Sequence, residues 1–298
     1  MRPLLFLISI LAMSVAHANV PVVTVQGLTI DFSPFTLVAS PGETLSVNVP
    51  EGFQVVLQGK QQTKEGSNSW ALNAPTAPGH YEVKVADATG REMHLNLFVT
   101  VPANAVTNET LNAYRIGPPP PGKKTHSALY EPPTGFIEVT EAMHDLQLSP
   151  NFRLKQFLCK QADGYPKYIV LQENLLALLE GLLQLVRERG YPAETFGVIS
   201  GYRTPWYNKK IGNVPNSRHV YGDAMDFFID VDADGKMDDL NRDGIHNRQD
   251  VDLLADIAEE YMARPKSRLV HGGVGRYGKT DRHGGFVHID TRGYFARW

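Results

Sequence analysis

The sequence has almost no cysteine, no excess of basic charge and no long apolar run beyond its N-terminus. Its single cysteine, Cys159, excludes an intramolecular disulfide, and its apolar neighbours favour a small buried side chain over a nucleophile. The 29 Lys and Arg residues are outnumbered by 32 Asp and Glu residues, so no basic surplus is present to attract nucleic acid. No later segment is apolar for long enough to cross a bilayer. We therefore expect neither a nucleic-acid partner nor membrane insertion of the mature chain.

The N-terminus has the pattern of an export signal. Arg2 precedes an apolar run over residues 4–15, and Ala16-His-Ala18 supplies small residues at the positions that a signal peptidase reads. The run is too short for a membrane anchor, and no cysteine follows it for lipid attachment. Residues 1–18 are therefore predicted to be a signal peptide, and the mature protein is predicted to be periplasmic or extracellular.

Residues 19–102 contain short segments in which apolar and polar residues alternate. Turn dipeptides such as Pro41-Gly42 and Pro78-Gly79 separate these segments, and no helical period is present. This pattern predicts an all-β sandwich of immunoglobulin-like type. The segment contains no catalytic constellation, so its expected role is spacing, docking or stabilisation of the domain that follows.

The composition changes after the β-rich segment. Residues 103–136 include Gly117-Pro-Pro-Pro-Pro-Gly122, which excludes helix and central strand. They predict a proline-rich linker, or a strap laid across the next domain. Helical and strand patterns are interleaved irregularly over residues 137–298, which predicts an α+β domain. Its clearest elements are an amphipathic helix over residues 168–189 and strands over residues 225–230 and 286–290.

Three residues of the C-terminal domain have the chemistry of one divalent-metal site. Asp226 and His288 lie in two predicted strands, with apolar neighbours that point to the opposite face. His219 lies in a loop seven residues before Asp226, and Gly222 allows that loop to turn back. A His/Asp/His set leaves one position of a tetrahedral zinc open, as hydrolytic sites do, whereas four protein ligands close a structural site. Spacing alone also fits ordinary core or surface histidines.

Longer motifs surround these three residues. They are Ser200-Gly-Tyr-Arg-Thr-Pro205, Gly212-Asn-Val-Pro-Asn-Ser-Arg-His219 and His288-Ile-Asp290, with Asp226 between the last two. This order resembles the zinc D-Ala-D-Ala carboxypeptidase family of cell-wall carboxypeptidases and endopeptidases, whose site is also similar to that of the hedgehog signalling domain. The resemblance covers residues 151–298 and does not extend to the β-sandwich. It implies a hedgehog-like α+β fold for the C-terminal domain.

The resemblance also implies roles for individual residues. His219, Asp226 and His288 would be zinc ligands. Arg203 matches the family's arginine, which holds a substrate carboxylate or steadies the developing oxyanion; a planar cation with several donors suits either task.

Proton transfer is the least determined part of the site. Some relatives carry a Glu or Asp three residues before the last ligand, where this sequence has Gly285. His283 lies five residues before His288, where the murein endopeptidases also have a histidine. It is predicted to transfer the proton during hydrolysis. Asp290 shares a strand face with His288 and is expected to orient its imidazole. His271 is a weaker candidate, expected on the rim of the pocket.

An acidic insertion at residues 230–250 follows the strand of Asp226. It contains D-x-D-x-D-G and D-x-N-x-D-G, which begin like calcium loops, but neither has Glu at the twelfth position. A solvated acidic loop is the alternative to a calcium site. The predicted calcium ligands are Asp230, Asp232, Asp234, Asp239, Asn241, Asp243 and Asp250.

Together these features predict an exported zinc metallopeptidase that cleaves peptide bonds in peptidoglycan stem peptides or cross-links. The peptidoglycan peptide is the expected partner, and Zn²⁺ the expected cofactor, with Ca²⁺ as a second candidate. Two alternatives stay open: a non-catalytic, metal-stabilised wall-binding module of the same fold, and a general secreted protease or dipeptidase. Retention of three ligands together with Arg203 argues against the first alternative.

Overall fold

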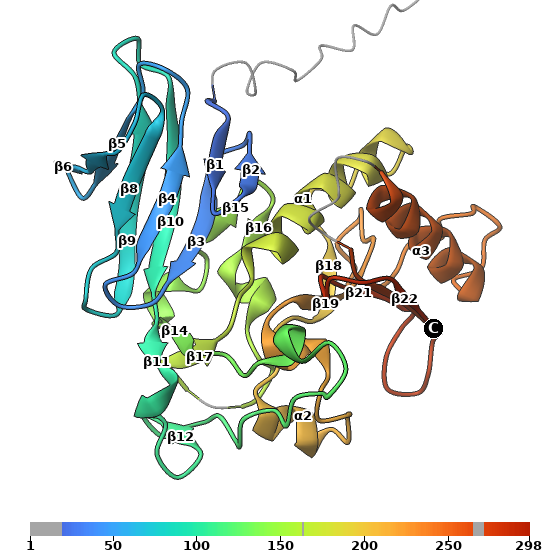
Figure 1. Cartoon of the computed structure of the whole chain (residues 1–298). Helices are drawn as coiled ribbons and strands as arrows, with labels where there is room; N and C mark the ends of the chain where they lie inside the picture. Colours follow the sequence, from blue (N-terminus) through green and yellow to red (C-terminus); the bar gives the residue numbers. More distant parts are fainter. Residues whose placement is uncertain (1–19, 163, 265–270) are drawn as a thin grey trace, which may run out of the picture.

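The computed structural model describes residues 20–162, 164–264 and 271–298, and the predicted signal peptide lies outside them. Figure 1 shows a β-rich N-terminal part, in blue to cyan, beside a C-terminal part that contains the helices. This arrangement confirms a β-rich α+β protein in outline. Within the described residues, no helix is long and apolar enough to cross a membrane.

Two five-stranded sheets make up the N-terminal part. Inward side chains alternate with exposed ones, as Leu45 and Val47 do in β4, and both sheets contribute to one hydrophobic core. β3 runs parallel to β10, whereas the other pairs are antiparallel. The immunoglobulin-like type of this part stays a prediction. The first sheet has the order β2 (Leu28–Ile30), β1 (Val23–Val25), β4 (Thr44–Asn48), β8 (Ser69–Asn73), β7 (Thr63–Lys64). The second has the order β3 (Phe35–Ala39), β10 (Glu92–Val99), β9 (Gly79–Ala86), β5 (Gln54–Leu57), β6 (Lys60–Gln61).

Residues 103–134, which we call the strap, lead from the sheets to the C-terminal part. The backbone amide of Trp206 donates to the carbonyl of Ile116 at 2.9 Å, so the strap lies against the C-terminal part. Gly117 allows this approach, because a Cβ there would lie 2.5 Å from the Trp206 nitrogen. The elements of the strap and its flanks are β11 (Val101–Pro102), η1 (Ala103–Ala105), β12 (Thr110–Leu111), β13 (Tyr114–Arg115) and η2 (Ser127–Tyr130).

The C-terminal part is built around a five-stranded sheet. Its order is β18 (Gly197–Ser200), β19 (Ala224–Phe228), β21 (Phe286–Asp290), β20 (Gly273–Tyr277), β22 (Ala296–Arg297). The helices are α1 (Glu173–Glu188), α2 (Pro205–Lys210) and α3 (Arg248–Ala263). Smaller elements are β14 (Gly135–Val139), β15 (Gln147–Ser149), β16 (Phe152–Arg153), β17 (Lys167–Ile169), η3 (Glu141–Met143), η4 (Leu154–Phe157) and η5 (Arg218–Tyr221).

α1 begins five residues later than the helical pattern predicts. Residues 167–169 pair with β14 as strand β17 instead, because tertiary pairing outweighs local helical propensity there. The leucines of α1 form the predicted buried stripe.

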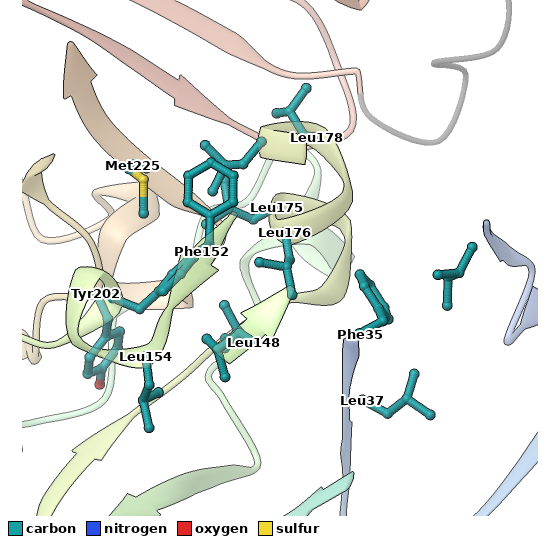
Figure 2. Close-up of a cluster of buried hydrophobic side chains, with 14 of the residues drawn as sticks. Phe35, Leu37, Leu148, Phe152, Leu154, Leu175, Leu176, Leu178, Tyr202 and Met225 are labelled. Atoms are coloured by element: carbon teal, nitrogen blue, oxygen red, sulfur yellow. The ribbon is translucent and has the colours of Figure 1, made fainter. Parts of the chain in front are cut away.

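The two parts share a continuous core. Figure 2 shows Phe35 and Leu37 of β3 in the same cluster as Leu176 of α1 and Leu148 of β15. Polar contacts reinforce this packing: the Thr36 hydroxyl donates to the Leu148 carbonyl at 2.9 Å, and the Val38 amide donates to the half-buried Glu173 carboxylate at 2.8 Å. The N-terminal sheets are therefore docked on α1.

Candidate active site

One register row of the C-terminal sheet carries the centre of the site. Ser200 of β18 lies opposite Asp226 of β19, Asp226 opposite His288 of β21, and His288 opposite Gly275 of β20. Because successive side chains alternate across a strand, Met225 points to the other face, where it joins the core (Figure 2). The row therefore brings residues from four strands onto one face.

His219 reaches the same face from η5. Gly222 ends this turn with φ +75°, and a Cβ there would lie 2.4 Å from the Val170 carbonyl oxygen, so glycine is required. The His219 Nδ1 lies 2.7 Å from the carbonyl oxygen of Gly201. A carbonyl only accepts, so Nδ1 carries the hydrogen and Nε2 presents a lone pair.

The three predicted ligands converge on one point. His219 Nε2 lies 3.1 Å from Asp226 Oδ1, His288 Nδ1 lies 2.7 Å from the same oxygen, and the two nitrogens are 3.2 Å apart. All three side chains are buried. Donor atoms this close, from two imidazoles and a carboxylate, fit one metal ion with three protein ligands.

The outer nitrogen of His288 is anchored as well. Its Nε2 donates to Asp290 Oδ2 at 3.0 Å, and Asp290 Oδ1 accepts from the Gly273 amide at 2.9 Å and from Arg292 Nε at 2.8 Å. This places Asp290 where the sequence analysis expected an orienting carboxylate. Arg292 is a further member of the site, two residues beyond Asp290 in the chain. Each histidine thus has its tautomer set by a partner outside the metal position.

Burial and ion pairing shift the pKa values of these groups in different directions. Burial lowers the pKa of His219. Burial would also lower the pKa of His288, but its hydrogen bonds to Asp226 and Asp290 outweigh burial and raise it to about 9. Burial opposes ionisation of Asp226, yet the neighbouring His219 and His288 hold its pKa well below the ordinary value. Without metal, the site therefore holds a carboxylate against a protonated His288.

Arg203 is bound to a predicted ligand. Its Nη2 pairs with Asp226 Oδ2, and its Nε donates to the Ser200 hydroxyl at 2.7 Å. The side chain is only 9% exposed. Among the described residues Nη1 has no hydrogen-bond partner. Arg203 therefore fixes the carboxylate of Asp226, and Nη1 is the group left to meet a substrate.

His283 lies outside the ligand cluster. Its Nδ1 donates to the Gly284 carbonyl at 2.8 Å, which leaves Nε2 with a lone pair, and its ring lies 5.0 Å from that of Phe286. Phe286 shares the strand face of His288, so His283 is on the same side of β21 as the cluster. His271 packs on Phe295 with ring centroids 4.6 Å apart and is not part of the cluster.

Gly285 lies three residues before His288, at the position where a carboxylate was considered from the sequence. A Cβ at this position would lie 2.7 Å from Val251 of α3 and 3.4 Å from the Met237 sulfur. A side chain here would thus meet the helix behind the sheet. Position 285 therefore contributes no side chain to the site in this protein.

Lys160 was not singled out from the sequence. Its Nζ lies 3.4 Å from the Val198 carbonyl, on the edge strand β18. Partial burial, and then the charge of Arg203, lower the pKa of Lys160. A lone lysine after the cysteine gives no motif by which sequence could have found it.

The strap contacts both chain segments that carry histidine ligands. Arg218, the neighbour of His219, donates from Nη1 to the Leu129 carbonyl at 2.5 Å. The hydroxyl of Tyr130 lies 2.9 Å from that of Tyr294, which follows β21. The guanidinium of Arg218 also lies 4.8 Å from the Tyr130 ring. The strap thus ties the two segments together from the outside.

The acidic insertion repeats one turn twice. In the first copy the carboxylate of Asp230 accepts from the amides of Asp234 and Gly235, and in the second that of Asp239 accepts from the amides of Asp243 and Gly244. Oxygens of Asp230, Asp232 and Asp234 lie within 4.8 Å of one another, but such exposed groups are common without an ion. Calcium binding stays a prediction.

Asp250 differs from the other predicted calcium ligands because it is fully buried. Its Oδ1 accepts from the amides of Leu240 and Asn241, and its Oδ2 accepts from that of Asn247. The first contact is 2.9 Å and the last is 2.8 Å. Asp250 therefore closes the N-terminus of α3 and fastens the insertion to it.

Comparison with known proteins adds the family. Residues 150–247, which include Arg203, His219 and Asp226, match the family model described as Peptidase M15. These residues are therefore similar to the peptidase M15 family. The match confirms, for this region, the resemblance to the zinc D-Ala-D-Ala carboxypeptidase family, and peptidases of the M15 family are zinc-dependent.

A search of curated proteins found no match to this chain. A solved structure described as the Bacteroides ovatus mixed-linkage glucan utilization locus SGBP-B, in complex with a mixed-linkage heptasaccharide, is similar at 9% identity with a TM-score of 0.17. That match covers 32% of this chain and 43% of the other.

Proposed function

We propose that this protein is an exported zinc metallopeptidase that hydrolyses peptide bonds in peptidoglycan stem peptides or cross-links. The observation that carries the proposal is the convergence of His219, Asp226 and His288, each with its outer atom anchored, in a chain whose M15 region holds two of the three. The export signal predicted from residues 1–18 supports this proposal, because it would deliver such an enzyme to the compartment that contains the cell wall.

The residues of the chain divide the work of hydrolysis. Bound zinc would supply a Lewis acid that polarises the scissile carbonyl and makes water more acidic. Asp290 and Gly201 keep the ligand nitrogens aimed at one point, so little reorganisation is needed when the metal binds. Arg203 Nη1 would bind the substrate carboxylate or the developing oxyanion, in a site where burial strengthens charge interactions.

His283 is the proposed proton carrier. Its Nε2 is free to accept, because Nδ1 donates to Gly284. Its ring packs on Phe286, which lies two residues before His288 on the same strand face, and this position supports a role beside the bound substrate. With Gly285 directed behind the sheet, no carboxylate competes for this role at that position.

The calcium proposal is separate from the peptidase proposal. We propose that the repeated Asp turns of residues 230–250 take calcium through carboxylate and carbonyl oxygens, and that the ion would brace the segment after β19. Support comes from the alternate spacing of oxygen donors with Gly at the sixth position.

Digestion of purified peptidoglycan tests the peptidase proposal. Mature protein would be stripped of metal, reloaded with zinc, and incubated with sacculi, and the muropeptides identified by mass spectrometry. We expect zinc-dependent loss of a terminal D-residue or of cross-links. His288→Ala should be inactive, and His144→Ala, which changes an exposed histidine outside the site, should match wild type.

The same assay separates the alternatives. Unchanged muropeptides, with zinc bound at one ion per chain, would overturn the peptidase proposal and favour a binding module. Cleavage of casein or free dipeptides without any muropeptide change would favour a general secreted protease.

A further inference from the structure

Gly275 lies at one end of the register row that carries the proposed metal ligands. The indole of Trp298 occupies the space that a side chain at Gly275 would fill. Gly275 lies opposite His288, and a Cβ on it would lie 2.6 Å from the indole of Trp298. A Cβ on Gly273, two residues earlier on the same face, would lie 2.9 Å from the same ring. Two glycines therefore make a flat seat for Trp298 beside the ligand cluster. The indole and the His288 imidazole have centroids 5.3 Å apart.

Trp298 is held firmly in this seat. Its backbone amide donates to Val274 at 3.3 Å, its carbonyl accepts from Arg276 at 3.0 Å, and its indole nitrogen donates to the Tyr277 hydroxyl at 2.7 Å. The Arg292 guanidinium lies 4.9 Å from its ring. Trp298 nevertheless stays 46% exposed. A large apolar surface that is both fixed and open to solvent is what a binding contact requires, since little side-chain entropy is lost on binding.

The row has different chemistry at its two ends. Arg203 and Ser200 lie on the β18 side of the ligand cluster, and Trp298 lies on the β20 side. A peptide laid across the strands would therefore meet a cation on one side of the scissile bond and an indole on the other. Each peptide residue spans roughly 3.3–3.6 Å, so an indole next to His288 lies within about two residues of the reacting carbonyl.

We propose that Trp298 is a substrate-binding residue that packs against the small apolar side chain, such as that of alanine, next to the scissile bond. This inference rests on the proposed peptidase function. The short distance to His288 favours the stem peptide over the more distant sugar as the group contacted. Trp298 thereby selects the residue on the side of the bond opposite Arg203.

Steady-state kinetics on purified muropeptides test the contact. Trp298→Ala should raise KM about tenfold, as expected for loss of one apolar contact, and change kcat less than about twofold. Trp298→Phe should fall between Ala and wild type. Phe295→Ala is the matched control, because Phe295 is an exposed aromatic of the same terminal segment that packs on His271 instead.

Gly275→Ala gives an independent variant. It keeps the indole but displaces it from its seat, and should raise KM in the same way. Zinc content and Tm, measured for every variant, separate this effect from unfolding or metal loss. An unchanged KM in Trp298→Ala, while wild type cleaves, would overturn the inference alone, whereas intact muropeptides with wild type would overturn the proposed function.

Product binding supplies a readout without turnover. Titration of zinc-loaded wild type with the cleaved muropeptide should change tryptophan emission, and the change should be lost in Trp298→Phe. Trp70 is buried in the N-terminal sheets and Trp206 lies under Arg115, so both serve as an internal background. No change in wild type, or an equal change in the variant, would contradict the contact.

Discussion

The chain carries two clusters of metal-binding side chains, and the fold holds them in different ways. His219, Asp226 and His288 are buried, come from three separated segments, and have their outer atoms fixed by further partners. The two Asp turns within residues 230–244 come from one short stretch, are half-buried to exposed, and are held by hydrogen bonds to their own backbone. The first cluster is organised before metal arrives, whereas the second would have to gain its geometry from the ion.

Removal of a buried ligand should have the largest effect. In His288→Ala we expect zinc stoichiometry to fall from one per chain to near zero and muropeptide cleavage to fall to background, because two ligands do not hold a catalytic zinc. Metal analysis and product mass spectrometry check this. Full zinc occupancy in the variant would mean that the buried cluster is not the metal site.

The buried cluster should also give the metal-free protein a pH-dependent stability. The pKa of His288 is raised to about 9 from 6.5, so its contribution is complete below pH 6.5 and is lost as pH rises through 9. The shift corresponds to about 3 kcal/mol. Chemical denaturation of metal-free protein from pH 6 to 10 should show this loss, and metal-free His288→Asn should lack it. Equal slopes in the two proteins would contradict the assignment.

Loss of an anchoring partner should have an intermediate effect. Asp290→Asn keeps the shape of the side chain but weakens the charge-assisted bond to His288, and should lower zinc affinity about 10–100-fold. Competition with a chromogenic chelator measures this. Asp281→Asn, an exposed aspartate in the loop before β21, is the control and should bind zinc like wild type.

Changes in the exposed cluster should have the smallest effect. Without calcium, Asp234→Asn should alter the free energy of unfolding by less than about 0.5 kcal/mol. With millimolar calcium, wild type should gain about 1 kcal/mol and the variant should not. Asp250→Ala should lower the free energy of unfolding by about 2–4 kcal/mol, because it leaves buried amides without acceptors. This loss is larger than both the effect of Asp234→Asn and the gain from calcium. If calcium raised the free energy of unfolding of Asp234→Asn as much as that of wild type, these turns would not be the calcium site.

The convergence of His219, Asp226 and His288 could be predicted from the sequence because the motifs that contain them are local. His219, Asp226 and the His288-Ile-Asp290 run each lie in a recognisable pattern, and the alternation of a strand predicted the face of Asp290. The burial of Cys159 was predicted from its apolar neighbours and is confirmed. The start of α1 was predicted too early, because the pairing of residues 167–169 with β14 depends on a segment thirty residues away in sequence.

Contacts that depend on register could not be predicted. Trp298 reaches the site only because Gly275 pairs with His288. The local sequence around neither residue predicts that pairing. Lys160 likewise depends on the position of η4 beside the edge strand. Arg203 was expected to face substrate, but its bond to Asp226 required the register of Ser200 and Asp226 to be known.

The strap has a consequence for where the chain can be truncated. Its Leu129 carbonyl and Tyr130 hydroxyl join the segments of His219 and His288, and Tyr130 packs with Val220 and Tyr221 in a small apolar cluster of its own. A truncation at residue 137 would uncover these aromatic rings. A transferable form of the C-terminal part would therefore have to keep the proline-rich segment, together with the N-terminal sheets that share its core.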